Sequence, residues 1–126
     1  MATMTGAMKP DLLASLRTAV AALDAKKAYE VAAFDVSQQT SLTDAFVLCS
    51  VGSNRQAQAV ADEVERSLKE QGVRPLSVEG YAQGGWVLLD YGDFVVHVFL
   101  EERRDYYALE RLWGDATEIL AELRPD

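Results

Sequence analysis

Two apolar runs meet at Gly92 and Asp93, and this junction constrains the fold more than any other feature of the 126-residue sequence. Short apolar runs joined by a two-residue loop with glycine are typical of a β-hairpin, because glycine adopts the positive φ that type I′ and II′ turns require. With these two residues as the loop, Tyr91 pairs with Phe94. Moving the loop back by one residue would set Asp90 opposite Asp93, a destabilising like-charge pair. We therefore predict a hairpin centred on Gly92 and Asp93.

This pairing predicts which side chains share a face, because side chains alternate between the two faces along each strand. One face is apolar except for a tyrosine hydroxyl, and we predict that it packs on the core: Val87, Leu89, Tyr91, Phe94, Val96 and Val98. The opposite face, called the outer face below, comprises Trp86, Leu88, Asp90, Val95, His97 and Phe99. An unpaired charge is costly inside a sheet, whereas this mixture is typical of the centre of a protein interface. We interpret the outer face as a docking surface, although a one-residue slip would exchange the two faces.

Other interpretations of the outer face remain open. A histidine in a strand is often a hydrogen-bonded packing residue, and Trp86 could cap the edge of the core. The face could also join two copies of the chain. A catalytic role is disfavoured, because Leu88 rather than Asp90 is the pairing neighbour of His97 and no serine or second histidine completes a relay. One histidine and no clustered cysteines also disfavour a zinc site.

The rest of the chain alternates helical and strand patterns. Apolar residues recur at helical spacing after Pro10, a residue suited to the first turn of a helix. Ser53 and Gln56 have the spacing of a capping box, and Gly72 is a stop signal for the helix that they begin. The expected elements are a helix over 11–27, strands over 31–36 and 46–51, a helix ending at 72, a short strand over 75–78, the hairpin and a last helix over 105–123.

These elements predict an α/β fold with one domain over residues 10–126. We expect a mixed sheet of four to five strands flanked by helices. A chain of this length buries enough surface to fold without a metal or a disulfide. The single cysteine, Cys49, lies in an apolar run and is interpreted as a buried strand thiol. Residues 1–9 are expected to be disordered.

The charge of the chain disfavours nucleic acid as a direct partner. The net charge is −8, and residues 75–126 carry 11 acidic and 4 basic side chains, a net −7. Phosphate backbones repel such a surface, whereas a basic protein attracts it. No apolar run reaches the roughly 20 residues that span a membrane, and the amino end has the pattern of neither a secretion signal nor a transit peptide. We therefore expect a cytoplasmic protein that binds no membrane.

The turn at Gly52 and Ser53 is a second candidate for chemistry. It lies between a strand and a helix, where backbone N–H groups and the helix dipole can hold an anion. It lacks the patterns of a phosphate loop and of a dinucleotide fingerprint. A nucleotidyl-transfer site also needs paired carboxylates for magnesium, and Asp62, Glu63 and Glu65 lie within the amphipathic helix instead of on a strand. A nucleotide-binding or nucleotidyl-transfer protein stays an alternative, and a helix cap is the favoured interpretation.

The chain carries several motifs in a fixed order: DAF at 44–46, GSNRQ at 52–56, EG at 79–80, the hairpin at 86–99 and RDYYALERLW at 104–113. Their order and spacing resemble the ribosomal silencing factor family, also called the Iojap family. The resemblance covers residues 11–115. It implies a small α/β fold that is related to nucleotidyltransferases but lacks their catalytic carboxylates. It also implies that the protein is not an enzyme, and we expect it to use no cofactor or metal.

The resemblance further implies a partner. Members of the family bind protein fourteen of the large ribosomal subunit at the subunit interface. They thereby obstruct joining of the small subunit and lower translation when nutrients run short. Members also tend to self-associate, so a homodimer is expected for the free protein.

The family's motif, carried onto this sequence, places the partner-binding residues on the outer face and just after it. The expected contact residues are Trp86, Leu88, Asp90, His97, Arg104 and Tyr107. The first two are expected as apolar anchors, and Asp90 as an acceptor for a basic residue of the ribosomal protein. His97 is expected as a polar contact or an orienting group. The last two either line the same site or tie the last helix to the sheet.

Overall fold

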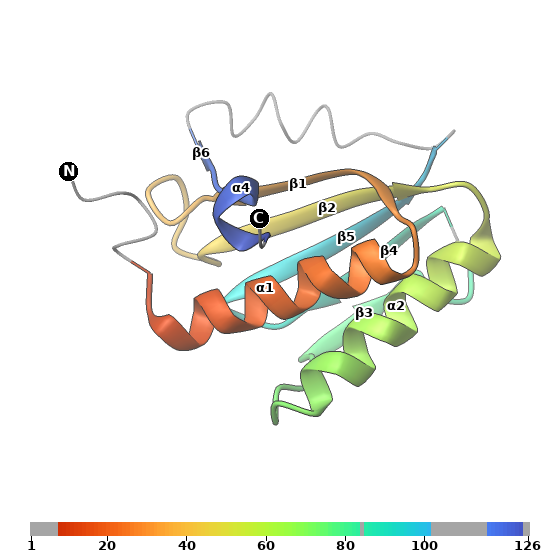
Figure 1. Ribbon diagram of the computed structural model, residues 1–126, viewed down its shortest axis with the longest axis horizontal. Helices are drawn as coiled ribbons and strands as arrows, with labels where there is room; N and C mark the ends of the chain where they lie inside the picture. Colours follow the sequence, from red (N-terminus) through yellow and green to blue (C-terminus); the bar gives the residue numbers. More distant parts are fainter. Residues whose placement is uncertain (1–7, 84, 102–115, 125–126) are drawn as a thin grey trace.

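The structure, a computed structural model, describes residues 8–83, 85–101 and 116–124 (Figure 1). Their strands form one six-stranded sheet in the order β3-β4-β5-β2-β1-β6. Neighbouring strands are antiparallel except for the central pair of β2 and β5, which is parallel. The predicted mixed sheet is confirmed, with six strands where four to five were expected. The strands are β1 Tyr29–Asp35, β2 Ala45–Val51, β3 Ser77–Glu79, β4 Trp86–Asp90, β5 Phe94–Leu100 and β6 Thr117–Glu118.

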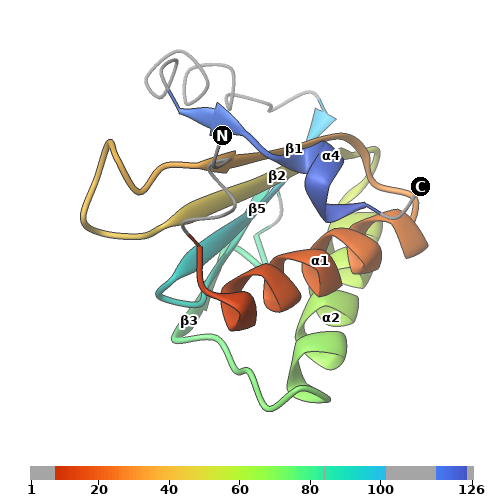
Figure 2. The ribbon, with the colours of Figure 1, turned by 60° about the vertical axis from the view of Figure 1, so that its left-hand side comes forward.

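The helices of the described residues cover one face of the sheet. α1 Pro10–Ala25 and α2 Asn54–Lys69 lie side by side across this face, and the short α4 Leu120–Leu123 packs against α1 and β1 (Figures 1 and 2). The main core lies between these helices and the sheet, where Leu16, Val64 and Val96 are fully buried. None of the helices in the described ranges is long and apolar enough to cross a membrane. No described helix covers the opposite face of the sheet, on which the outer face of the hairpin lies.

The prediction of one last helix over 105–123 is partly wrong. Residues 117 and 118 form β6, which pairs antiparallel with the end of β1, and the Ile119 N–H donates to the carbonyl oxygen of Ala33 at 2.9 Å. The apolar spacing in this segment also fits a helix, but pairing with β1 gives the backbone of that sheet edge hydrogen-bond partners. In the described part of the predicted helix, only Leu120–Leu123 is helical. Residues 105–115 lie outside the described residues.

The other predicted elements all occur, with bounds that differ by up to three residues. α1 begins at Pro10, as expected of a proline in a first turn, and buries Leu12, Leu16 and Leu23 along one stripe. Cys49 is buried in β2. The local sequence patterns therefore located these elements. The extra strand, β6, forms because its segment pairs with β1, which is distant in the sequence.

Candidate functional site

The hairpin has the predicted register. Leu88 pairs with His97, and the Tyr91 N–H donates to the Phe94 carbonyl oxygen at 2.9 Å. Gly92 has a φ of +85°, the positive value that the two-residue turn requires. The predicted core face is confirmed, because all six of its residues are buried: Val87, Leu89, Tyr91, Phe94, Val96 and Val98.

Trp86 lies partly exposed at the start of β4. Its indole Nε1–H donates to Nδ1 of His97 at 3.1 Å, and its ring packs on Phe99 with the ring centroids 5.0 Å apart. The residue is nevertheless 43% exposed. An aromatic side chain that is held by a hydrogen bond loses little freedom when a partner covers it. Trp86 therefore has the properties of a preorganised anchor.

His97 is a buried member of the outer face. It is only 4% exposed, because β5 lies between β4 and β2 and the rings of Phe46 and Phe99 lie against the imidazole. Burial lowers the pKa of His97 from 6.5 to about 4, so the ring is neutral at neutral pH. Since Nδ1 accepts the indole hydrogen, the ring proton of His97 lies on Nε2. His97 orients Trp86, and a direct contact of His97 with a partner stays a prediction.

Leu88 and Asp90 lie half-buried on the outer face. Asp90 Oδ1 accepts a hydrogen bond from the Gly92 N–H at 2.8 Å, so its carboxylate fixes the turn of the hairpin. This structural role was not predicted from the sequence. The contact of Asp90 with a basic partner residue stays a prediction.

A pocket of about 280 Å³ opens beside these residues. It joins the outer face to β2 and to the loop between β1 and β2, and most of its wall is apolar. Its lining residues are Thr40, Leu42, Thr43, Phe46, Leu88, Asp90, Val95 and His97. Trp86 does not line the pocket, but it is hydrogen-bonded to His97, which does. Arg104 and Tyr107 lie outside the described residues, so their predicted roles stay predictions.

Sequence reasoning missed the contribution of the loop between β1 and β2. Leu42 is 88% exposed at this pocket, and Thr43 is buried. The end of the loop is tied to the hairpin, because the Asp44 N–H donates to the Asp93 carbonyl oxygen at 2.9 Å. A lone leucine within the polar stretch 37–43 was the available signal, but no local pattern indicates where such a loop packs.

The turn at Gly52 forms a helix cap. Ser53 Oγ accepts from the Gln56 N–H at 3.0 Å, and Gln56 Oε1 accepts from the Gly52 N–H at 2.8 Å. The predicted capping box is confirmed, with the glutamine reaching Gly52 instead of the backbone of Ser53. Asn54 Oδ1 accepts from the Gly85 N–H at 3.3 Å and so ties this turn to the start of β4. Two N–H groups that an anion could use thus have side-chain partners, which favours the cap over a nucleotide site.

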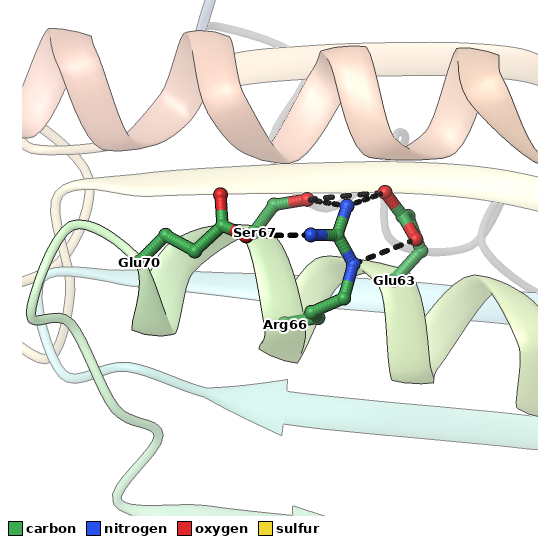
Figure 3. A network of polar contacts seen from close by, with 4 residues as sticks. All are labelled: Glu63, Arg66, Ser67 and Glu70. Carbon is green, nitrogen blue, oxygen red and sulfur yellow. Dashed lines mark hydrogen bonds and ion pairs between the residues drawn. The ribbon is translucent and has the colours of Figure 1, made fainter.

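Acidic residues on α2 and at its C-cap take part in contacts on the surface of that helix. Figure 3 shows Arg66 between two of them: its Nη1 donates to Glu70 Oε2 at 2.7 Å and its Nε donates to Glu63 Oε1 at 3.2 Å. The hydrogen bond from Arg66 lowers the pKa of Glu63 below its usual value. Asp62 accepts from the Tyr81 hydroxyl at 3.0 Å. Within the described ranges, no group of three or more His, Cys, Asp or Glu side chains could hold a metal ion.

Comparison with known proteins gives consistent results over most of the chain. The family model described as ribosomal silencing factor during starvation matches residues 9–126. A ribosomal silencing factor of Halalkalibacterium halodurans is 45% identical over 104 residues, which cover 82% of this chain and 89% of that protein. A ribosomal silencing factor of Bacillus subtilis is 43% identical over 101 residues, covering 80% of this chain and 86% of that protein. A crystal structure of a Chromobacterium violaceum protein matches with a TM-score of 0.76 at 42% identity, covering 85% of this chain and 88% of that chain.

Proposed function

This chain belongs to the ribosomal silencing factor family, and we propose that it lowers translation by binding protein fourteen of the large ribosomal subunit. Family membership confirms the resemblance that the sequence motifs indicated and assigns the chain a ribosome-associated silencing role. Bound at the subunit interface, the protein blocks joining of the small subunit. It acts in the cytoplasm, and its response to nutrient limitation follows from the same proposal.

The outer face of the hairpin carries the proposal. Trp86 is partly exposed and fixed by its hydrogen bond to His97, and Leu88 and Asp90 lie beside it next to an apolar pocket. Protein interfaces are typically centred on such a preorganised aromatic residue surrounded by apolar contacts that exclude water. This combination supports a protein partner for the face.

The charge of the chain supports a basic partner. The net charge is −8, and Asp90 places one carboxylate within the proposed contact surface. An acidic surface speeds encounter with a basic protein and slows encounter with exposed RNA phosphates. A ribosomal protein at the edge of an RNA surface is therefore a better match than the RNA itself.

Steric obstruction is sufficient for the proposed mechanism. Silencing needs no catalytic group, because a folded domain bound on the joining surface occupies space that the small subunit needs. Binding strength and occupancy then determine the degree of silencing. Any substitution that weakens docking without unfolding the domain should restore subunit joining in proportion.

Replacing Trp86 by alanine tests the proposal. We expect Trp86→Ala to lose about 2–4 kcal/mol of binding free energy to purified large subunits, as for a hot-spot aromatic residue, and to permit subunit joining. Co-sedimentation and a subunit-joining assay measure both effects. Leu76→Ala is the control, because Leu76 is also exposed, at 75%, but does not line the pocket.

The result also separates docking from packing. If Trp86 only packed on the core, Trp86→Ala would instead cost about 3–5 kcal/mol of unfolding free energy, measured by denaturant titration. Failure of the unaltered protein to co-sediment with large subunits would refute the proposed function.

We also propose that the free protein is a homodimer. The outer face exposes part of Trp86 beside a mostly apolar pocket, and a second copy could cover this surface in the absence of the ribosome. Sedimentation velocity measures the monomer–dimer equilibrium. A shift of this equilibrium toward the monomer in Trp86→Ala would show that one face serves both contacts, whereas a monomeric unaltered protein would contradict the dimer.

A further inference from the structure

Two residues that line the pocket beside the outer face have buried polar atoms without a hydrogen-bond partner among the described residues. Four buried side-chain atoms of the described residues make no hydrogen bond: Asp35 Oδ2, Thr43 Oγ1, Tyr91 Oη and His97 Nε2. Of these four residues, Thr43 and His97 line this pocket. Both are more than nine-tenths buried, at 8% and 4% exposed. A buried polar atom without a partner is costly, and a functional contact is one reason for a protein to keep it.

The hydrogen-bonding character of His97 Nε2 is fixed by its surroundings. The opposite nitrogen, Nδ1, accepts from the indole of Trp86, a residue that does not line the pocket. The ring is neutral, so Nε2 carries the hydrogen, and this N–H, on a side chain that lines the pocket, has no acceptor among the described residues. The T-shaped contact with Phe46 supplies only an aromatic ring, which is a weak acceptor. His97 therefore presents a donor that needs an oxygen acceptor.

The charges around the pocket restrict what can supply that oxygen. Among the described residues that line the pocket, only Asp90 is charged, and none is Lys or Arg. A phosphate or carboxylate would meet the Asp90 carboxylate without a compensating positive charge. A cation by itself would leave the His97 donor unsatisfied. The walls formed by Leu42, Phe46 and Val95 match an apolar group.

We propose that this pocket receives an uncharged oxygen of the protein partner, carried on an apolar segment, with Thr43 and His97 as the groups that recognise it. The oxygen is a main-chain carbonyl, a hydroxyl or a side-chain amide oxygen. The inference rests on the proposed function, because it specifies the chemistry of the same docking surface. It extends that surface from the hairpin to the loop between β1 and β2, and it makes Thr43 a specificity-determining residue.

A pair of substitutions at Thr43 tests the inference. Thr43→Val keeps the shape of the side chain and removes the hydroxyl, whereas Thr43→Ser keeps the hydroxyl. We expect Thr43→Val to bind purified large ribosomal subunits about tenfold more weakly, because it leaves the partner's oxygen with one hydrogen bond fewer. The melting temperature of the free protein should stay the same or rise, because the unpartnered hydroxyl is gone. Thr43→Ser should bind within about twofold of the unaltered protein.

Thr18→Val is the matched control. Thr18 lies on α1, on the other side of the sheet, and its hydroxyl accepts from Gln71. The same chemical change there should leave ribosome binding unchanged. A loss of binding in Thr43→Val with an unchanged or raised melting temperature is an outcome that a purely structural role of Thr43 does not produce.

Three results would overturn the inference, and they are distinguishable. Equal binding by Thr43→Val and the unaltered protein, with Trp86→Ala still defective, would refute the pocket and leave the proposed function in place. A change in self-association without a change in ribosome binding would identify a second copy of this chain as the occupant. No binding by the unaltered protein would overturn the proposed function and this inference together.

Discussion

His97 shows how one position combines several roles. The sequence placed it on the outer face with Trp86 and Asp90, and the register confirms that placement. Its burial could not be predicted from the hairpin alone, because the rings of Phe46 and Phe99 lie against it in the assembled sheet. A neutral, buried imidazole orients Trp86 through Nδ1 and leaves the Nε2 hydrogen without an acceptor among the described residues.

Protonation of His97 should make the stability of the protein depend on pH. Burial lowers its pKa to about 4 in the folded state, against 6.5 for the ordinary value. The unfolded chain therefore binds more protons between these values, and stability is lost as the pH falls from about 6.5 to 4. The full effect is up to about 3 kcal/mol of unfolding free energy.

Urea titrations at a series of pH values measure this effect. His97→Gln is the comparison, because glutamine does not titrate and its amide oxygen can still accept from the indole of Trp86. We expect the unaltered protein to lose more stability than the variant between pH 6.5 and 4. Parallel pH curves for the two proteins would contradict the assignment of this dependence to His97.

At the scale of elements, the β4–β5 hairpin was the element most completely predicted from its own sequence. Its alternation, its two-residue loop and the like-charge pair in the competing register all lie within one short segment. The cap of α2 is equally local, since Ser53 and Gln56 are three residues apart. β6 could not be predicted in this way, because its strand conformation depends on pairing with β1, which is far away in the sequence.

Gly80, between β3 and β4, should be much less tolerant of alanine than Gly72. Both have similar positive φ values, +81° and +79°, so backbone strain is about the same, roughly 1–2 kcal/mol. A Cβ atom at Gly80 would overlap the carbonyl oxygen of Trp86, whereas one at Gly72 would meet no atom within 4 Å. We expect Gly80→Ala to lose at least about 2 kcal/mol more unfolding free energy than Gly72→Ala.

Denaturant titration measures that difference, and co-sedimentation measures its functional consequence. Displacing the backbone at Trp86 should also weaken binding to large subunits, while Gly72→Ala should bind normally. Equal stability losses in the two variants would contradict this prediction. They would show that the backbone at Trp86 can shift to accommodate the added Cβ atom at little cost in free energy.

At the scale of the whole molecule, charge and steric bulk act together. The net charge of −8 favours approach to a basic partner from any direction, whereas contact charges act only where they meet the partner. Asp90 and Asp24 allow these two effects to be separated. Asp90 lines the pocket. Asp24 lies on α1 and is paired with Arg124, with Oδ1 and Nη2 2.7 Å apart.

Asp90→Asn and Asp24→Asn change the net charge equally. We expect Asp90→Asn to weaken ribosome binding about tenfold and to flatten its dependence on salt, because a charged contact is lost. The amide oxygen can still accept from Gly92, so the fold should persist. Asp24→Asn should change binding by less than about twofold. Binding measurements over a salt series check this, and equal effects of the two variants would show that net charge alone matters.

The sequence by itself determined the parts of the protein that depend on local interactions. These are the register and core face of the hairpin, the cap of α2, the apolar stripe of α1 and the family motifs. The shared face of Trp86, Leu88, Asp90 and His97 follows from the same local alternation. Such features are predictable because their energetics depend on residues a few positions apart.

The tertiary structure alone decided what surrounds that face. Parallel pairing of β2 with β5 brings Phe46 beside His97, and the loop between β1 and β2 brings Leu42 and Thr43 to the same pocket. These contacts join segments about 50 residues apart, and many packings of the same local elements are compatible with the sequence pattern. Only the balance of burial and backbone pairing over the whole sheet selects one of them. That selection buries the imidazole and creates the pocket beside the exposed tryptophan.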